Sequence, residues 1–284
     1  MRTQVGIIGS GPAGLLLSQL LDLQGIESVV LERRSQAYVL SRVRAGVLEE
    51  GTVAMLRQAQ AGERMDREGL VHEGLDIAIG DRRHRIDLKK HTGKTLMFYG
   101  QTELTKDLMD AREALNAQIV YEAKNVSIED LDSKTPKLRY EKNDKKYEVV
   151  CDFIAGCDGF HGISRRSIPK TVLKTHEQVY PFGWLGILSE TKPVSDEVIY
   201  VNNWHGFALC SMRSMTRSRY YIQCAFDEDL EKWTDDRFWD ALRTRLPRDA
   251  AELLEVGPSI EKSIAPLRSF VAEPIQHGRL FLAG

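Results

Sequence analysis

The chain has 284 residues, enough for one large domain or two, and its 42% hydrophobic and 28% charged residues are typical of a globular protein. A net charge of −2 gives no general attraction to nucleic acid or to anionic lipid. The apolar N-terminus is too broken by glycine for a membrane span or a signal peptide. The four cysteines form no CxxC pair and no zinc spacing, so we expect no metal site and a cytoplasmic protein.

The first thirty residues are predicted to form a strand, a helix and a second strand. Val5–Ile8 is a short apolar run that ends in glycine, as a buried parallel strand would. Leucines then recur at helical spacing from Leu15 to Leu23, and Ser28–Leu31 is a second apolar run closed by Glu32. This order and length predict a βαβ unit.

The rest of the chain alternates between helical and strand patterns. Helices are predicted over Ser41–Gln58, over Thr102–Leu115 with Thr102 opening it, and near Asp235–Leu246. A hairpin is predicted over Leu75–Leu88, and strands from Ile119 to Ile154 with a charged turn at Lys142–Lys146. After a linker at Pro169–Pro181, an antiparallel sheet is predicted from Val198–Val201, Phe207–Met212 and Tyr220–Phe226.

A glycine-rich loop joins the first predicted strand to the first helix. Gly9, Gly11 and Gly14 have the spacing G-x-G-x-x-G, which allows a sharp turn, a close approach of a pyrophosphate and tight helix–sheet packing. Glu32 ends the next strand 18 residues after Gly14, where a carboxylate can bind a ribose 2′-hydroxyl. The alternative is a tight turn without a ligand. The pattern favours a dinucleotide with a free 2′-hydroxyl, NAD or FAD rather than NADP.

Longer motifs resemble a known family. Cys157-Asp158-Gly159 follows an apolar run, and Arg279–Gly284 reads RLFLAG. Together with the segments Arg42–Gly51, Tyr99–Gln101, Gly156–Arg165, Tyr180–Gly186, Gly206–Tyr221 and Glu261–Phe270, they resemble the flavin-dependent aromatic hydroxylases over essentially the whole chain. The resemblance implies FAD as the dinucleotide and opposes a reading as an NAD-dependent dehydrogenase.

The resemblance also implies a fold and a domain division. The family fold is α/β, a Rossmann-like FAD-binding domain interleaved with a substrate domain on a mixed or antiparallel sheet. We expect the FAD-binding domain at residues 1–72, 97–175 and 275–284, and the substrate-binding domain at 73–96 and 176–274. The family continues past the RLFLAG motif, so we expect a fragment of a longer protein that is inactive alone. A homodimer of the full-length protein is left open.

By resemblance, a set of residues along the chain holds FAD. Glu32 would bind the adenosine ribose, and Asp158 would lie near the diphosphate. Ala13 departs from the serine of close family members, so one phosphate contact is lost and binding weakens. The expected cofactor residues are Gly9, Gly11, Ala13, Gly14, Glu32, Arg42, Arg44, Gly46, Val47, Gln101, Asp158 and Gly159. The alternatives are solvated arginines and simple turns.

A carboxylate site is predicted on two neighbouring strands. Ser211 and Arg213 are two residues apart, as are Arg219 and Tyr221, so each pair emerges on one face of its strand. An arginine fork with hydroxyls suits the carboxylate of a benzoate. The resemblance assigns Ser211, Arg213 and Tyr221 to that carboxylate. The alternatives are half-buried sheet tyrosines and a solvated basic edge.

The resemblance assigns Tyr200 to the substrate's phenol. A phenolate is a better nucleophile toward activated oxygen than a neutral phenol, so a hydrogen bond from Tyr200 would lower the substrate's pKa and open a proton path. His72 is the family candidate for the far end of that path, with a packing or surface histidine as the alternative.

The electron donor is expected to be NADPH or NADH, bound at the surface, because only one glycine motif occurs. Arg33 and Arg34 could accept a 2′-phosphate, which favours NADPH, or be ordinary exposed arginines. The resemblance adds further donor candidates, and the set is Arg33, Arg34, Tyr38, Arg44, His161 and Arg268.

The resemblance implies an FAD-dependent monooxygenase that converts 4-hydroxybenzoate to 3,4-dihydroxybenzoate with O2 during the degradation of aromatic compounds. Two alternatives stay open, a hydroxylase of another hydroxybenzoate and a flavin-binding module without activity.

Overall fold

The computed structural model describes residues 1–42 and 46–284. Its eight-stranded sheet has a parallel centre in the order β18-β11-β1-β2-β8, with β17 antiparallel at one edge and the β9–β10 hairpin extending β11. The strands are β1 (Arg2–Ile8), β2 (Ser28–Leu31), β8 (Gln118–Val120), β9 (Lys124–Glu129), β10 (Lys137–Lys142), β11 (Lys145–Gly156), β17 (Gln276–His277) and β18 (Leu280–Leu282). Parallel neighbours with a crossover helix confirm the predicted βαβ unit.

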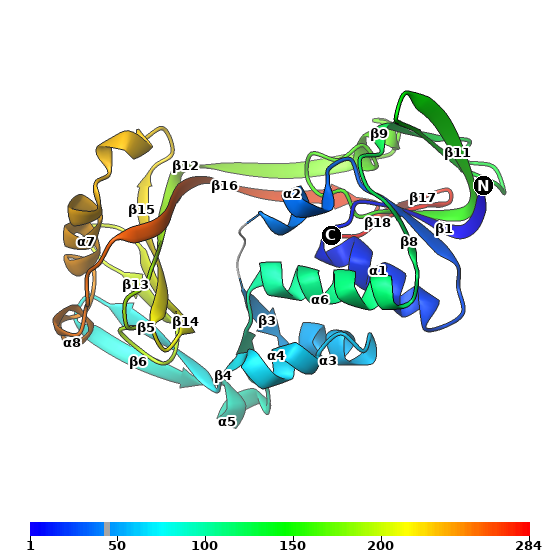
Figure 1. The fold of residues 1–284 in the computed structure, drawn as a ribbon. Coiled ribbons are helices and arrows are strands. Elements are labelled where there is room, and N and C mark those ends of the chain that lie inside the picture. Colours follow the sequence, from blue (N-terminus) through cyan, green and yellow to red (C-terminus); the bar gives the residue numbers. More distant parts are fainter. Residues whose placement is uncertain (43–45) are drawn as a thin grey trace.

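A seven-stranded sheet occupies the other half of the molecule (Figure 1). Its order is β16-β12-β15-β14-β13-β5-β6, antiparallel throughout except for the parallel pair β5 and β13. The strands are β5 (Gly74–Ile79), β6 (Arg82–Asp87), β12 (Lys174–Ser189), β13 (Ile199–Asn202), β14 (Ala208–Ser214), β15 (Arg217–Ala225) and β16 (Ser259–Glu273). The α/β class with a parallel sheet and a mixed sheet is as predicted.

A third sheet and the helices complete the fold. The sheet has the order β3-β7-β4, with β3 (Val47–Glu49), β4 (Leu70–His72) and β7 (Leu96–Phe98). The helices are α1 (Pro12–Asp22), α2 (Gln36–Leu40), α3 (Glu50–Gln58), α4 (Glu63–Glu68), α5 (Leu88–Thr92), α6 (Gln101–Ala114), α7 (Asp235–Arg243) and α8 (Arg248–Glu252). Two short 3-10 turns lie at Arg165–Ser167 and Leu230–Lys232.

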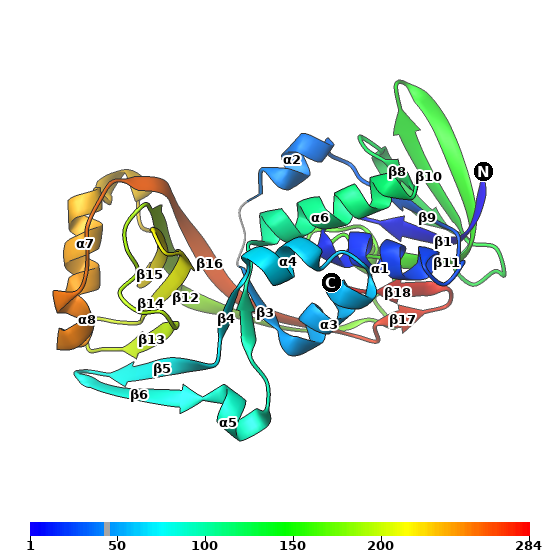
Figure 2. The same ribbon diagram turned by 60° about the horizontal axis from the view of Figure 1, so that its bottom comes forward.

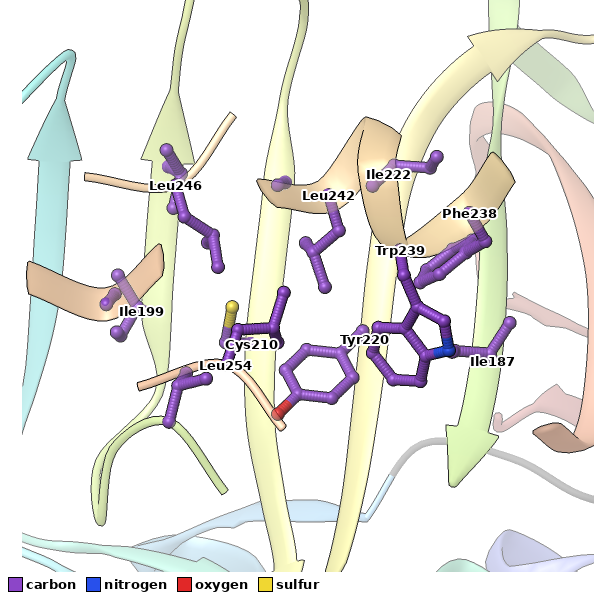
Figure 3. Close-up of a cluster of buried hydrophobic side chains, with 14 of the residues drawn as sticks. Ile187, Ile199, Cys210, Tyr220, Ile222, Phe238, Trp239, Leu242, Leu246 and Leu254 are labelled. Carbon is purple, nitrogen blue, oxygen red and sulfur yellow. The ribbon is translucent and has the colours of Figure 1, made fainter. Parts of the chain in front are cut away.

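Helices α7 and α8 cover one face of the seven-stranded sheet (Figure 2). Phe238, Trp239 and Leu242 form the buried stripe of α7, and they pack on Tyr220 and Ile222 of β15 (Figure 3). Thr234 caps α7 by accepting a hydrogen bond from the backbone N–H of Arg237. Alternate residues of each strand point into this core, so the residues between them face the other way.

The segment predicted as one helix over Ser41–Gln58 is not continuous, and that prediction is wrong in part. Only Glu50–Gln58 is helical, Val47–Glu49 pairs with Leu96–Phe98 as strand β3, and α2 at Gln36–Leu40 was not predicted. A three-residue strand is too short to show alternation, so tertiary pairing decided its conformation. Helix α6 begins at Gln101, one residue before the expected start, with Gly100 as its N-cap.

The linker predicted at Pro169–Pro181 is also wrong in part, because strand β12 already begins at Lys174. Lys174–Val179 pairs with Arg268–Glu273 of β16 as a two-stranded ribbon (Figure 1). Its side chains are almost all exposed, so no buried face marks the strand in the sequence. The ribbon runs from the seven-stranded sheet toward the eight-stranded one, and the predicted domain boundaries stay a prediction.

Candidate active site

The glycine loop after β1 packs closely on the end of β11. Gly9 has φ +103°, and a Cβ on it would lie 2.4 Å from the carbonyl oxygen of Cys157. A Cβ on Gly14 would lie 2.0 Å from the carbonyl oxygen of Gly9, so α1 approaches the strand closely. A Cβ on Gly11 would meet no atom of the described chain within 4 Å. The loop therefore packs tightly against the protein at Gly9 and Gly14 and leaves open space at Gly11.

A cavity of about 1010 Å³ lies outside this loop, at the carboxyl ends of the parallel strands. That position is where open α/β sheets bind ligands. It is bordered by many of the predicted residues: Gly9, Gly11, Ala13, Glu32, Arg33, Arg34, Tyr38, Arg42, Gln101, Asp158, Gly159 and His161. Gly14 packs behind the loop, and Gly46, Val47 and Arg268 lie away from this lining. Arg44 falls outside the described residues.

Glu32 is buried at the cavity wall and held by three hydrogen bonds. One carboxylate oxygen accepts from the backbone N–H of Ser10 at 3.0 Å and from its hydroxyl at 3.2 Å. The other accepts from the backbone N–H of Arg34 at 2.8 Å. These contacts fix the carboxylate where a ribose would approach. Ser10 was missed by the sequence reasoning because it occupies a spacer position of the glycine motif.

Asp158 is held in a similar way on the opposite side of the glycine loop. Its carboxylate accepts hydrogen bonds from the backbone N–H of Ser164 at 2.9 Å and from the Ser164 hydroxyl at 3.0 Å. It packs against Gly162, where a Cβ would come within 2.0 Å of its Cγ. Two carboxylates with fixed orientations therefore border the cavity. Their acceptor oxygens are positioned before any ligand binds.

The donor candidates fall into two groups. Arg33, Arg34 and Tyr38 border the cavity, and the Arg34 guanidinium lies 4.9 Å above the Tyr38 ring. Arg268 lies on the β12–β16 ribbon, pairs with Glu177 at 3.0 Å and stacks 4.9 Å above the ring of Phe160.

His161 connects the two groups. It borders the cavity, and its ring lies 4.9 Å from that of Phe160, the residue under Arg268. The donor candidates thus extend from the cavity mouth onto the ribbon.

The predicted substrate residues share one face of the seven-stranded sheet. Strand register pairs Tyr200 with Leu209, and Leu209 with Tyr221. Ser211 lies two residues beyond Leu209 and pairs with Arg219, so it points to the same side. This side is opposite to the core under α7, where Tyr220 and its even-numbered neighbours pack. We call it the polar face: Tyr200, Ser211, Arg213, Arg219 and Tyr221.

Arg213 ends this row next to the loop before β3. A Cβ on Gly46 would lie 2.5 Å from Nη1 of Arg213 and 3.0 Å from the carbonyl oxygen of Tyr99. Burial lowers the pKa of Arg213 and nearby Arg219 lowers it further, while Tyr221 and Glu261 act in the opposite direction. Among the described residues, Arg213 has no carboxylate within ion-pair distance. A half-buried guanidinium in this state favours an anionic ligand.

Aromatic rings complete the polar face. The Tyr221 ring fits over Gly186, where a Cβ would lie 2.6 Å from its Cε1. Trp184 stacks on Phe207 with ring centroids 5.1 Å apart and lies 5.7 Å from the Tyr221 ring. Tyr200 is 37% exposed. The face therefore combines a guanidinium, hydroxyls and flat apolar surface, which matches a benzoate chemically.

His72 lies on β4 and is buried, with 3% of its surface exposed. Its ring stacks on Phe98 at 3.9 Å, and neither ring nitrogen has a hydrogen-bond partner among the described residues. Burial lowers the pKa of His72 despite the raising effect of Glu197 and Asp196. The structure thus places this candidate in the interior rather than at the surface.

The residues present fit an FAD molecule at the cavity. The open side of Gly11 leaves room for a diphosphate at the start of α1, where no side chain caps the helix. Glu32 offers a fixed carboxylate, and Gln101 and Thr105 border the cavity from α6. The comparison with known proteins agrees with this geometry.

The chain matches the family model described as FAD binding domain over residues 2–284, and it belongs to that family of flavoproteins. It is 54% identical to p-hydroxybenzoate hydroxylase from Acinetobacter baylyi, over 100% of this chain and 70% of that protein. It is 26% identical over 57% of its length to a probable NADH-specific resorcinol 4-hydroxylase from Rhodococcus jostii, of which the match covers 32%.

Solved structures share the fold at low sequence identity. p-Nitrophenol 4-monooxygenase from Pseudomonas putida superimposes with a TM-score of 0.81 at 17% identity, covering 99% of this chain and 72% of that one. A Pseudomonas aeruginosa protein in complex with 2-aminobenzoylacetate gives 0.83 at 16%, covering 99% and 78%. Within the part of the chain that the structure describes, no helix has the length and apolarity needed to cross a membrane.

Proposed function

We propose that the protein hydroxylates 4-hydroxybenzoate to 3,4-dihydroxybenzoate, using FAD, O2 and NADPH. The observation that carries this is the polar face, where half-buried Arg213 lies beside Ser211 and Tyr221 and against the Gly46 loop. The 54% identity to a p-hydroxybenzoate hydroxylase supports the same substrate. The predicted boundaries between FAD-binding and substrate-binding domains remain part of this proposal.

Arg213 would bind the benzoate carboxylate through its planar fork, with Ser211 and Tyr221 as additional donors. Binding would replace the missing counter-ion of a guanidinium whose burial is otherwise unfavourable. The flat surface made by Trp184 and Phe207 would hold the ring and exclude water from it. The substrate is therefore oriented with its carboxylate at β14 and β15.

Tyr200 would donate a hydrogen bond to the phenolic oxygen and favour its ionised form, which activates the ring carbon next to it. When bound, reduced FAD supplies the electrons and the activated oxygen. Overall, one oxygen atom enters the ring and the other leaves as water, while NADPH is oxidised. His72 stays the proposed distal proton acceptor.

The cofactor and donor assignments are proposed on the same basis. Glu32 would hold the ribose of FAD, and Arg33, Arg34, Tyr38, His161 and Arg268 would hold the donor by their charge and position. Arg33 and Arg34 favour NADPH over NADH because two guanidiniums can bind a 2′-phosphate. The four cysteines are buried and free, which fits the proposed cytoplasmic location.

The test is product analysis with the FAD-loaded full-length protein, NADPH, O2 and 4-hydroxybenzoate. We expect 3,4-dihydroxybenzoate by mass spectrometry, in amounts that match the NADPH consumed. Tyr200→Phe should keep the substrate's binding but lower product formed per NADPH, with hydrogen peroxide in its place. NADPH oxidation that 4-hydroxybenzoate leaves unchanged, with no hydroxylated product, would overturn the proposal. If hydroxylated product formed only from 2- or 3-hydroxybenzoate, the protein would instead be a hydroxylase of that hydroxybenzoate.

A further inference from the structure

A second arginine lies on the polar face beside Arg213, and it has its own carboxylate partner. Arg219 is 6% exposed, and its Nη1 lies 3.1 Å from Oε1 of Glu261. Its guanidinium also lies 5.0 Å above the Tyr221 ring. Glu261 is on β16, two strands away from Arg219 on β15.

The sheet register explains how the two side chains meet. Leu188 of β12 pairs with Arg219 on one side and with Glu261 on the other. The two long side chains therefore reach toward each other across Leu188, on the polar face. The neighbouring Lys262 points to the opposite face, where its Nζ donates to the backbone carbonyl of Trp233 at 2.7 Å.

The charges on this face do not cancel. Within the described residues, Arg213, Arg219 and Glu261 are the charged groups of β14, β15 and β16 that lie on this face beside the phenols of Tyr200 and Tyr221. Arg82 and His84 of β6 share the same face beyond Tyr200, where both are exposed to solvent and therefore screened. Glu261 acts on both arginines, because its charge also helps to hold up the pKa of Arg213. Two cations and one carboxylate leave an excess of one positive charge, which a benzoate would neutralise.

We propose that Glu261 is the counter-ion that sets this excess charge and thereby tunes how readily the bound substrate's phenol ionises. Glu261 is a positioning residue that acts through Arg219, and its role rests on the proposed function. With Glu261 present, the polar face binds a monoanionic benzoate and stabilises the phenolate only moderately. Without it, the second guanidinium would act on the phenolate unopposed.

The test measures the pKa of 4-hydroxybenzoate bound to the FAD-loaded full-length protein, from the absorbance of phenol and phenolate across pH. Removing one charge from this partly buried face should move that pKa by about one pH unit. Glu261→Gln should lower it, Arg219→Gln should raise it, and the double variant should return it close to wild type. The double variant also carries the test if Glu261→Gln alone fails to fold because Arg219 is left without a partner.

A matched control lies two residues along the same strand. Arg217 pairs with Glu190 at 2.7 Å, and both side chains are exposed. Glu190→Gln should leave the bound pKa unchanged, since solvent screens that pair. Single variants at Glu261 and Arg219 that shift the pKa in the same direction, or not at all, would overturn the role of Glu261. A wild-type protein that binds no 4-hydroxybenzoate would instead contradict the proposed function.

Discussion

The two faces of the seven-stranded sheet use the same strands for different ends. On β15, Tyr220 and Ile222 point into the apolar core under α7, whereas Arg219 and Tyr221 point to the polar face. On the first face these side chains pack in an apolar cluster, whereas on the second Arg219 is buried and Arg213 is half-buried. Adjacent residues therefore differ in their surroundings, and under the proposed function the first set contributes to stability and the second to ligand binding.

This division predicts that substitutions at alternate residues of one strand have different effects. Those on the core face should change stability, and those on the polar face should change ligand affinity. The core face stabilises the fold by burying apolar side chains. A cavity there lowers the free energy of unfolding, since interiors are close-packed. On the polar face the partial burial of the Arg213 guanidinium is unfavourable, and the proposed binding of the substrate's carboxylate would offset that cost.

Phe238→Ala should lower the free energy of unfolding by about 3–5 kcal/mol, because it removes a fully buried ring between α7 and the sheet. Denaturant unfolding measures this loss. In the molecules that remain folded, the Kd for 4-hydroxybenzoate should stay within about twofold of wild type. A large change in that Kd with little loss of stability would break the division between the faces.

Arg213→Lys should weaken the use of substrate and leave the stability of the fold almost unchanged. The charge is kept but the two-donor fork is lost, so the KM for 4-hydroxybenzoate should rise about a hundredfold, equivalent to roughly 2–3 kcal/mol. The midpoint of thermal unfolding should fall little or not at all, because Arg213 has no carboxylate partner to lose among the described residues. Steady-state kinetics and calorimetry check the two halves, and an unchanged KM would remove Arg213 from the proposed carboxylate site.

We expect acid to lower the stability of the folded protein through His72, which lies on β4 of the three-stranded sheet. Burial lowers the pKa of His72 below the ordinary value of 6.5 in the folded state. Above about pH 7 the imidazole is neutral in both states and costs nothing. As the pH falls through 6.5, the unfolded chain takes up the proton first, so the folded state loses stability.

The loss should continue until the folded pKa is reached, at about 1.4 kcal/mol for each unit by which that pKa is lowered. His72→Phe should remove this part of the pH dependence, since Phe keeps the stacking on Phe98. Denaturant unfolding at pH 7 and pH 5 measures the difference. Equal pH dependence in the variant and the wild type would contradict the assignment.

Local patterns predicted the first βαβ unit and the place of its glycine loop. The spacing of Gly9, Gly11 and Gly14 and the position of Glu32 follow from one βαβ unit of consecutive elements, although the loop also packs on the distant residue Cys157. Strand alternation predicts that Ser211 and Arg213 share a face. The β14–β15 ladder is irregular between Met212 and Ser214, so the position of Arg213 is established by its approach to Gly46 rather than by alternation.

Contacts between distant segments could not be predicted in the same way. Glu261 meets Arg219 across a third strand, and this depends on the registers of β12 with both β15 and β16. The ribbon at Lys174–Val179 shows no buried face in its sequence, so it was taken for a linker. The contact between Gly46 and Arg213 joins segments more than 160 residues apart in sequence, by the difference of their numbers. Topology, rather than propensity, determined these features.

The separation of the two faces is tested most directly at two adjacent residues, Tyr220 and Tyr221. Unfolding free energy and the Kd of 4-hydroxybenzoate should be measured together for Tyr220→Ala and Tyr221→Phe. Tyr220→Ala should cost about 3–5 kcal/mol of stability and leave the Kd nearly unchanged, because its ring packs on Trp239 in the core. Tyr221→Phe should keep stability within about 1 kcal/mol and raise the Kd roughly tenfold by removing a donor to the carboxylate. If both variants changed stability and affinity in the same proportion, the account of two separate faces would be contradicted.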